Sequence, residues 1–196
     1  MEILEKIFGS EGKVKIMKLF IFNPTQAFDT KSIAKKTKVR EAGVKREINQ
    51  LVKISLLRKK EVRNNSGRKV NGWMLNPAFA YLDPLRDFLL HISPFTNDEV
   101  VRRLAKAGRL KLVVVSGVFI HEWEARVDIL IIGDKLKRNL IEKTIKEVES
   151  EMGKEIQYAV LDTEDFAYRL GVGDKLIRDI FDYPHKIIFN KIGLVE

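Results

Sequence analysis

The sequence predicts an α+β protein of two domains, and three observations support this prediction. A chain of 196 residues, 45% of them hydrophobic, is long enough to bury one sizeable core or two small ones. Its charge is uneven, because residues 1–96 hold 19 basic and 9 acidic side chains (+10) while residues 97–196 hold 17 and 18 (−1). Helices and a basic hairpin are predicted in the first half, and alternating strands and helices in the second. We therefore expect one domain over residues 1–93 and another over 94–196.

The composition excludes several classes of protein. The absence of cysteine excludes disulfides, thiolate zinc sites and a Cys nucleophile, and it fits a reducing cytoplasm. The first residues, MEILEKIF, lack the basic start of a signal peptide. The longest apolar run, near residues 110–120, is about half a membrane span. We therefore expect a soluble cytoplasmic protein with no membrane partner.

Two helices are predicted before residue 40. Residues 13–22 place apolar side chains among lysines at roughly helical spacing, and an Asn-Pro pair then ends this helix. A second, shorter helix is predicted over residues 29–37, where Asp29 or Thr30 can cap the N-terminus.

A third helix, predicted over residues 40–53, has the clearest amphipathic pattern. Val44, Ile48 and Leu51 fall on one stripe, which a core would cover. The opposite side carries long hydrogen-bond donors, on the face that a major groove of duplex DNA would meet. The residues of this segment that we expect to contact DNA are Arg40, Ala42, Lys45, Arg46, Asn49, Gln50 and Lys53.

Two strands joined by a turn follow the third helix. Residues 56–64 and 68–76 have strand character, and the sequence NNSG between them tolerates a positive φ. Basic side chains crowd this hairpin, where they could reach phosphates or a minor groove. Those that we expect to contact DNA are Arg58, Lys60, Arg63, Arg68 and Lys69.

In this order of elements, the segment from DTKSIAKKT to NGWMLN resembles the ArsR-like winged-helix regulators. The resemblance implies a supporting helix over residues 30–36, a recognition helix over 40–53 and a wing over 56–75. The sequence before His91 has no Cys or His, so a metal-sensing site of the kind that some relatives carry has no ligands. Two alternatives stay open at this point: a winged helix used only for protein interaction, and a basic surface that is merely solvated.

An apolar helix is predicted after the wing. Leu82, Leu85, Phe88, Leu89 and Ile92 recur at helical spacing, and a proline stands early enough to lie in the first turn. So apolar a helix after a wing commonly packs against a second subunit, and this makes it our candidate for a homodimer interface. Packing against the second domain of the same chain is the alternative.

The second half alternates strands and helices between glycines. The order is helix 97–108, strand 110–117, strand 126–134, helix 137–153, strand 155–162, two short helices and a last strand. Over about 90 residues this pattern resembles the minimal nucleotidyltransferase domains, which implies an α/β domain with a small mixed sheet. In that family a Gly-Ser turn holds a phosphate, and three carboxylates hold divalent cations.

Carried onto this chain, the family's active site is incomplete. The turn becomes Gly117-Val118 without its hydroxyl, and the carboxylate pair becomes Arg126 and Asp128. The third acid would fall near Gln157 or Tyr158, and neither has a carboxylate. We therefore expect no catalytic residue, no bound metal and no cofactor, and we keep Gly117, Arg126 and Asp128 as a candidate site for a small anionic ligand.

Other residues near this turn offer alternatives. Glu122 and Glu124 could rebuild a metal site, although the loop around them has no defined geometry. Asp128 could instead pair with Arg126 or cap a backbone turn. His121 and His185 stand alone in the sequence, which favours surface positions.

These patterns favour a DNA-binding transcriptional regulator. Its second domain would be a non-catalytic nucleotidyltransferase fold, used for dimerisation or for binding a ligand or partner. A different hypothesis is an active nucleotidyltransferase, or the antitoxin half of a toxin–antitoxin pair that modifies a toxin-like partner. A third assigns the basic surface to RNA, but a recognition helix favours duplex DNA, because A-form RNA closes its major groove.

Overall fold

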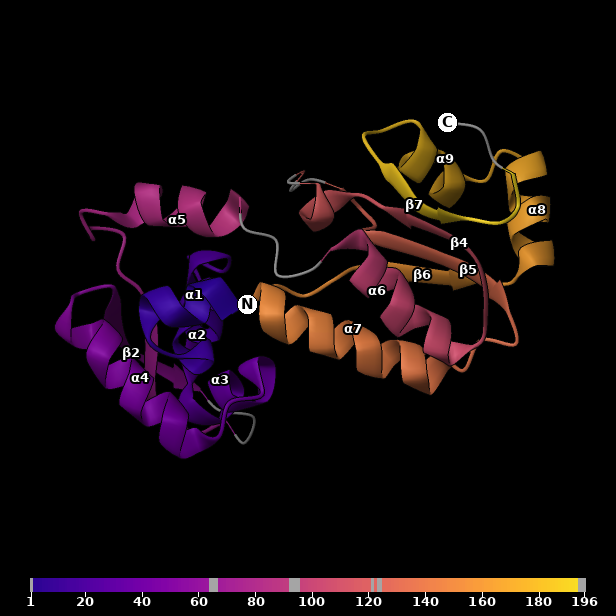
Figure 1. The fold of residues 1–196 in the computed structure, drawn as a ribbon. Helices are drawn as coiled ribbons and strands as arrows, with labels where there is room; N and C mark the ends of the chain where they lie inside the picture. Colours follow the sequence, from indigo (N-terminus) through magenta and orange to yellow (C-terminus); the bar gives the residue numbers. More distant parts are fainter. Residues whose placement is uncertain (1, 64–66, 92–95, 121, 123–124, 194–196) are drawn as a thin grey trace. The chain divides into compact units, whose positions relative to one another are not determined.

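The structure is a computed structural model that describes residues 2–63, 67–91, 96–120, 122 and 125–193 (Figure 1). Helices and strands both build it, which confirms the α+β class. The chain divides into two compact units. The first comprises Met1–Pro94 and Glu147–Lys154, and the second comprises Phe95–Lys146 and Glu155–Glu196. Each unit contains its own sheet.

The first unit consists mainly of short helices and a small sheet. The elements are α1 (Glu2–Phe8), α2 (Glu11–Ile21), β1 (Ala27–Asp29), α3 (Thr30–Thr37), α4 (Glu41–Lys53), β2 (Leu57–Arg63), β3 (Lys69–Leu75) and α5 (Leu82–His91). The three helices and the hairpin that the sequence predicts are all present, whereas α1 is additional. Residues 64–66 of the predicted turn NNSG lie outside the described residues.

Side-chain caps explain where two of these helices begin. Ser10 Oγ accepts a hydrogen bond from the backbone N–H of Lys13 at 3.0 Å, at the N-terminus of α2. Asp29 Oδ1 accepts one from the N–H of Ser32 at 2.7 Å, so the predicted cap of α3 is Asp29. Each cap satisfies an N–H group that would otherwise lack an intrahelical partner.

The small sheet places β3 between β1 and β2, and both pairs are antiparallel. In the register, Phe28 lies opposite Trp73 and Leu57 lies opposite Leu75. These side chains join one core with apolar residues of α1 to α5. The order helix, strand, helix, helix and hairpin, with the first strand paired to the last, is the topology of a winged helix.

Helix α2 buries seven of its eleven residues, including the lysine Lys18. This side chain is 1% exposed, and burial lowers its pKa to about 8, although the Glu151 carboxylate acts in the opposite direction. Folding therefore takes the ammonium group of Lys18 out of water, which is unfavourable.

The end of α7 belongs to the first unit. Asn23 Nδ2 donates to the carbonyl oxygens of Leu19 at 2.7 Å and Gly153 at 2.8 Å.

Helix α5 packs most of its apolar stripe within the first unit. Leu82 and Leu89 are 7% and 1% exposed, and both belong to the core of the first unit. Phe88 meets Phe8 of α1 edge to face, with 6.2 Å between the ring centroids. Phe8 belongs to α1, a helix that the sequence did not predict, so this helix adds to the packing of the stripe. Ile92 lies outside the described residues.

The second unit alternates strands and helices. The elements are α6 (Asn97–Leu104), β4 (Arg109–Val115), β5 (Ile129–Asp134), α7 (Arg138–Met152), β6 (Tyr158–Leu161), α8 (Thr163–Gly171), α9 (Lys175–Phe181) and β7 (Lys186–Asn190), with 3₁₀ turns at Ala105–Ala107 and Gly117–Phe119. The predicted strand over 126–134 begins only at Ile129, so Arg126 is not part of it. No helix of the described ranges is long and apolar enough to cross a membrane.

The sheet of the second unit is mixed, as predicted, in the order β6-β5-β4-β7. Strands β4 and β5 are antiparallel, while β5 and β6 are parallel and are connected through α7. Successive residues of a strand face opposite sides, and the four residues from Leu112 to Val115 are all buried, so helices cover both faces. Leu112 and Val114 pack with Phe166, Ile177 and Ile180 of α8 and α9.

Candidate nucleic-acid interface

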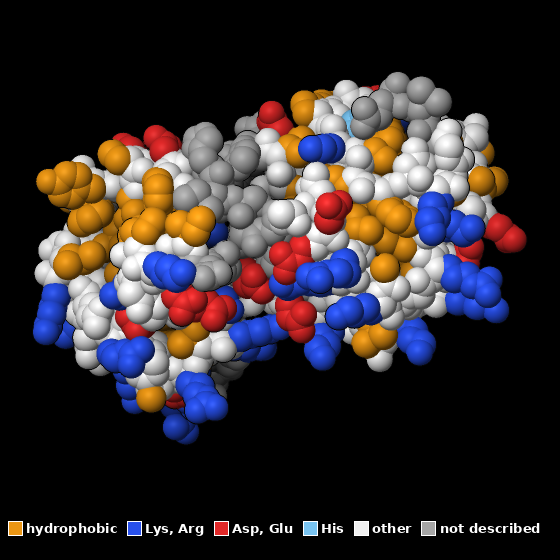
Figure 2. Space-filling model, viewed as in Figure 1, with side chains coloured by type: hydrophobic (Ala, Val, Ile, Leu, Met, Phe, Trp, Pro, Cys, Tyr) orange, Lys and Arg blue, Asp and Glu red, His pale blue; other side chains and the backbone are white. Residues whose placement is uncertain are grey.

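The two faces of α4 differ as the sequence predicts. Val44, Ile48 and Leu51 are at most 1% exposed and pack in the core of the first unit. The opposite face carries side chains with hydrogen-bonding ends, and packing of the apolar stripe fixes its direction. Figure 2 shows Lys and Arg side chains gathered over this helix and around α3. All seven residues that the sequence predicts to contact DNA in this segment are exposed, namely Arg40, Ala42, Lys45, Arg46, Asn49, Gln50 and Lys53.

A buried glutamate on α4 is a feature that the sequence analysis missed. The Glu47 side chain is 3% exposed, and its Oε1 accepts hydrogen bonds from Ser10 Oγ at 3.1 Å and Arg46 Nη2 at 2.8 Å. Its Oε2 lies 3.7 Å from Lys13 Nζ. This carboxylate therefore ties α4 to the start of α2 and holds one of the predicted DNA contacts. Its position beside the Val44–Ile48 stripe was a signal that could have revealed it.

The hairpin of β2 and β3 presents its basic residues to solvent. Arg58 and Lys60 lie on one face of β2, whereas Arg63 lies on the other and directly opposite Lys69 of β3. Like charges face each other there, and Lys69 Nζ is relieved by Glu61 Oε2 at 2.9 Å. The five hairpin residues predicted to contact DNA are all exposed, namely Arg58, Lys60, Arg63, Arg68 and Lys69.

Helix α3 adds further exposed basic side chains that our candidate set did not include. Lys31, Lys35 and Lys38 are exposed, and Lys38 adopts a left-handed conformation (φ +56°) just after the helix. Lys36 Nζ lies 5.8 Å from the centroid of the Phe28 ring. The run KKTK could have revealed these residues, because a supporting helix commonly contacts phosphates beside the groove.

In the second unit, the Asp128 carboxylate accepts hydrogen bonds from backbone N–H groups. Its side chain is buried, and it accepts hydrogen bonds from the N–H of Val118 to Oδ1 at 2.9 Å and from the N–H of Gln157 to Oδ2 at 2.8 Å. Gly117 has φ +55°, and a Cβ atom there would lie 2.0 Å from Asp128 Oδ1. Ser116 Oγ donates to the carbonyl of Val127. The carboxylate thus caps the turn, one of the two roles considered for it.

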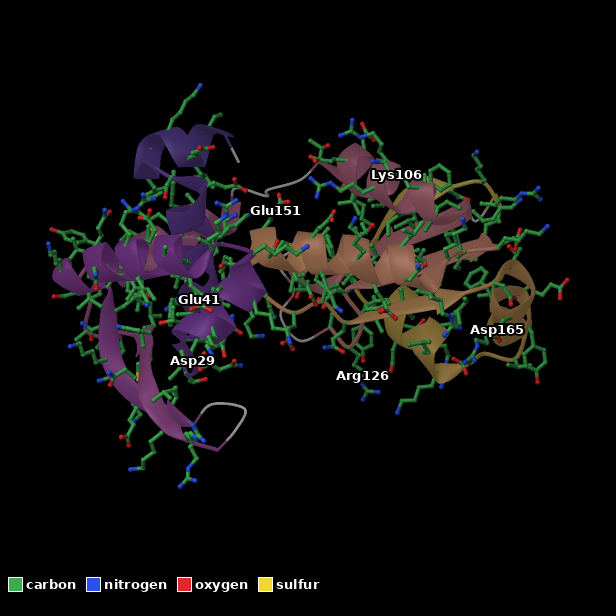
Figure 3. All side chains as sticks on the ribbon, turned by 90° about the horizontal axis from the view of Figure 1, so that it is seen from below. Asp29, Glu41, Lys106, Arg126, Glu151 and Asp165 are labelled. Atoms are coloured by element: carbon green, nitrogen blue, oxygen red, sulfur yellow. The ribbon has the colours of Figure 1, made fainter. Side chains whose placement is uncertain are left out.

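Arg126 does not pair with Asp128, which was the other role considered. Its guanidinium Nη1 lies 2.8 Å from Asp179 Oδ2 of α9, and its side chain is 66% exposed (Figure 3). A pocket of about 330 Å³ lies beside this ion pair. The residues that line it are Glu122, Ala125, Arg126, Asp179, Tyr183 and Pro184. Gly117 and Asp128, the other two candidate ligand-binding residues, are not among the residues that line this pocket.

The described residues form no cluster of three His or acidic side chains that could hold a metal ion. Gln157 contributes its backbone N–H to Asp128 and has no carboxylate. His121 and Glu124 lie outside the described residues. His185 Nδ1 lies 2.8 Å from the carbonyl oxygen of Tyr183, and its ring meets Phe181 edge to face.

Comparisons with known proteins yield one structural similarity. No protein-family model matches the chain, and no curated protein matches it. Among solved structures, the chain is similar to one titled "Possible transcriptional regulator from Methanosarcina mazei Go1", with 17% sequence identity and a TM-score of 0.34. The similarity covers 63% of this chain and 87% of that chain.

Proposed function

We propose that this protein is a transcriptional regulator whose first unit binds duplex DNA through α4 and the β2–β3 hairpin. The observation that carries the proposal is the two-sided helix α4, in which a core-packed apolar stripe directs a row of exposed donors to solvent. At 13 residues it is about 20 Å long. An α-helix with its side chains is about 10–12 Å across, which fits a major groove about 12 Å wide. All twelve residues predicted from the sequence to contact DNA are exposed.

Within this proposal, the two elements have different tasks. Arg46, Asn49 and Gln50 can donate to base edges, and Asn and Gln can also accept, so these residues carry the sequence preference. The lysines and arginines of the hairpin bind phosphates and set the register of the helix on the duplex. Arg46 is bound to Glu47 in the free protein, but its side chain is 69% exposed, so exchanging this partner for a base edge requires little rearrangement.

The second unit is non-catalytic in this proposal. Divalent cations that activate a triphosphate need several carboxylate oxygens, and both oxygens of Asp128 already accept backbone N–H groups. The guanidinium of Arg126 repels a cation and attracts an anion. The pocket beside it offers an acidic small molecule a place to bind if that ligand displaces Asp179 from the guanidinium.

We place a homodimer contact on α1 and the outer side of α5. Ile3 and Ile7 lie one turn apart on α1 and are 72% and 58% exposed, and Phe88 of α5 is 41% exposed. Figure 2 shows hydrophobic side chains gathered around α5 on the first unit. Pairing two copies would cover these side chains and would present two recognition helices to two half-sites.

Selection from a random pool of duplexes tests the proposed function. The full chain is incubated with the pool at about 0.1 M salt, and the retained fraction is sequenced after several rounds. We expect an enriched motif, arranged as an inverted repeat if the protein binds as a dimer. A parallel pool of RNA hairpins provides the comparison. Enrichment from the RNA pool alone, or no enrichment from either pool, would overturn the proposal.

A further inference from the structure

The basic residues of the second unit are concentrated at one end of its sheet. The unit, over residues 95–146 and 155–196, contains 16 Lys and Arg and 15 Asp and Glu, a net charge of +1. Residues 102–111 and 134–138 alone hold eight basic residues and one acidic residue (+7). The remainder of the unit therefore holds eight basic and 14 acidic residues (−6). An almost neutral unit is thus strongly polarised.

The fold brings these two segments together. Arg109 at the start of β4 lies opposite Asp134 at the end of β5, and the N–H of Lys137 donates to the carbonyl of Ala107 at 2.8 Å. The approach is closest at Gly108, where a Cβ atom would lie 2.6 Å from the carbonyl oxygen of Lys135. Residues separated by about 25 positions in sequence therefore share one surface.

Six of these eight cations are exposed, and four of them lie where the two segments meet. Lys106, Arg109, Lys135 and Lys137, the strand-end cluster, are exposed, and none of the four forms an ion pair with a described residue. Figure 2 shows Lys and Arg side chains at this end of the second unit, and Lys106 is labelled in Figure 3.

The acid within the two segments, Asp134, has another partner. Thr163 Oγ1 donates to its Oδ1 at 2.7 Å, and this hydrogen bond lowers the pKa of Asp134 below its usual value. The ionised carboxylate also attracts Arg109 electrostatically. One acid does not neutralise four cations on one surface, so these cations still repel one another, and a partner with several negative charges would relieve that repulsion.

We propose that the strand-end cluster binds the phosphate backbone of duplex DNA, as a second contact on the molecule that the first unit reads. This inference rests on the proposed function. Its four long, exposed side chains suit a line of phosphates, which duplex DNA supplies at about one charge per 1.7 Å of axis. Lysines supply charge without base preference, so this contact strengthens binding to every sequence alike.

The experiment measures how the affinity of the full chain for its selected duplex depends on salt. In the test variant, Lys106, Arg109, Lys135 and Lys137 are all changed to Gln. Each phosphate contact contributes about 0.9 to the slope of log affinity against log salt, so we expect the slope to become shallower by about 3–4. Between 50 and 200 mM salt, the wild type should then lose affinity roughly a hundredfold more than the variant. The preferred sequence should be unchanged.

Two matched variants accompany the test. The first changes Lys143, Lys146, Lys175 and Arg178 to Gln, which removes the same charge from exposed positions of the same unit. Its slope should stay close to that of the wild type. The second changes the three cluster lysines to Arg, and it should keep the full slope because the charges remain. Thermal unfolding confirms that each variant is folded.

The possible results separate this inference from the proposed function. A wild type that binds no duplex refutes the proposed function, and the inference falls with it. A wild type that binds duplex with the same slope as the cluster variant, or a control variant that loses as much slope, refutes only the inference. Cluster-dependent binding of RNA hairpins without cluster-dependent binding of duplex also overturns it.

Discussion

Replacing Asp128 by Asn should lower the free energy of unfolding of the second unit and should not remove any enzymatic activity. The carboxylate is 5% exposed and accepts two backbone hydrogen bonds, at 2.9 Å from Val118 and at 2.8 Å from Gln157. Asn keeps one acceptor but points an NH₂ group at the other N–H. A hydrogen bond to a charged group contributes about 1.5–3 kcal/mol, and a buried donor without a partner adds to the loss. We expect a loss of about 2–4 kcal/mol in the free energy of unfolding.

Hydrogen exchange at the two donating amides provides the direct assay. The amide protons of Val118 and Gln157 should be protected in the wild type, and at least one of them should exchange much faster in Asp128→Asn. Gly117→Ala serves as a companion variant, because its Cβ would collide with the intact carboxylate and should destabilise the same turn. Unchanged exchange and unchanged stability would refute the structural role of Asp128. A second result would also refute it. In that result the wild type transfers labelled nucleotide, Asp128→Asn abolishes the transfer, and Gly117→Ala preserves it.

Two further predictions concern the first unit. Lys18 has a folded pKa of about 8 against 10.5 for the exposed side chain, so the unfolded chain binds the proton more tightly and the wild type gains stability as the pH rises from about 8 to 10.5. Lys18→Met should therefore be more stable than the wild type at pH 7, by up to about 3 kcal/mol in the free energy of unfolding. Urea titrations should show this difference shrinking toward pH 10. A difference that does not depend on pH would contradict the burial of a charged lysine. Ile3→Glu with Ile7→Glu should convert a dimer into a folded monomer in sedimentation, because both side chains are exposed in the single chain. A wild type that is monomeric at micromolar concentration would remove the dimer from the proposal.

The features that the sequence predicts well are those that depend on nearby residues. The stripe of Val44, Ile48 and Leu51 and the cap of α3 at Asp29 involve residues three or four positions apart. The α+β class also follows from local periodicity, because strands and helices leave different spacings in the sequence.

The features that sequence reasoning missed depend on contacts between distant residues. The buried Glu47 carboxylate has a hydrogen-bond partner in Ser10, 37 positions away. Asp128 has its second partner in Gln157, 29 positions away. Lys18 breaks the usual rule that lysine is exposed, and no local pattern reveals this. The strand-end cluster likewise forms only when β4 pairs with β5.

The α4 variant Arg46→Ala, Asn49→Ala and Gln50→Ala tests most directly whether the first unit reads duplex DNA. These side chains are exposed, but Arg46 also binds the buried Glu47 carboxylate, so thermal unfolding first confirms that the variant is folded. Equilibrium binding is measured on the selected duplex and on a scrambled duplex of equal length and composition. Each base contact should contribute about 1–3 kcal/mol to binding of the selected duplex. We therefore expect the variant to lose its preference for the selected duplex, while its affinity for the scrambled duplex stays closer to that of the wild type. A variant that keeps the full preference would contradict the claim that α4 is the recognition helix.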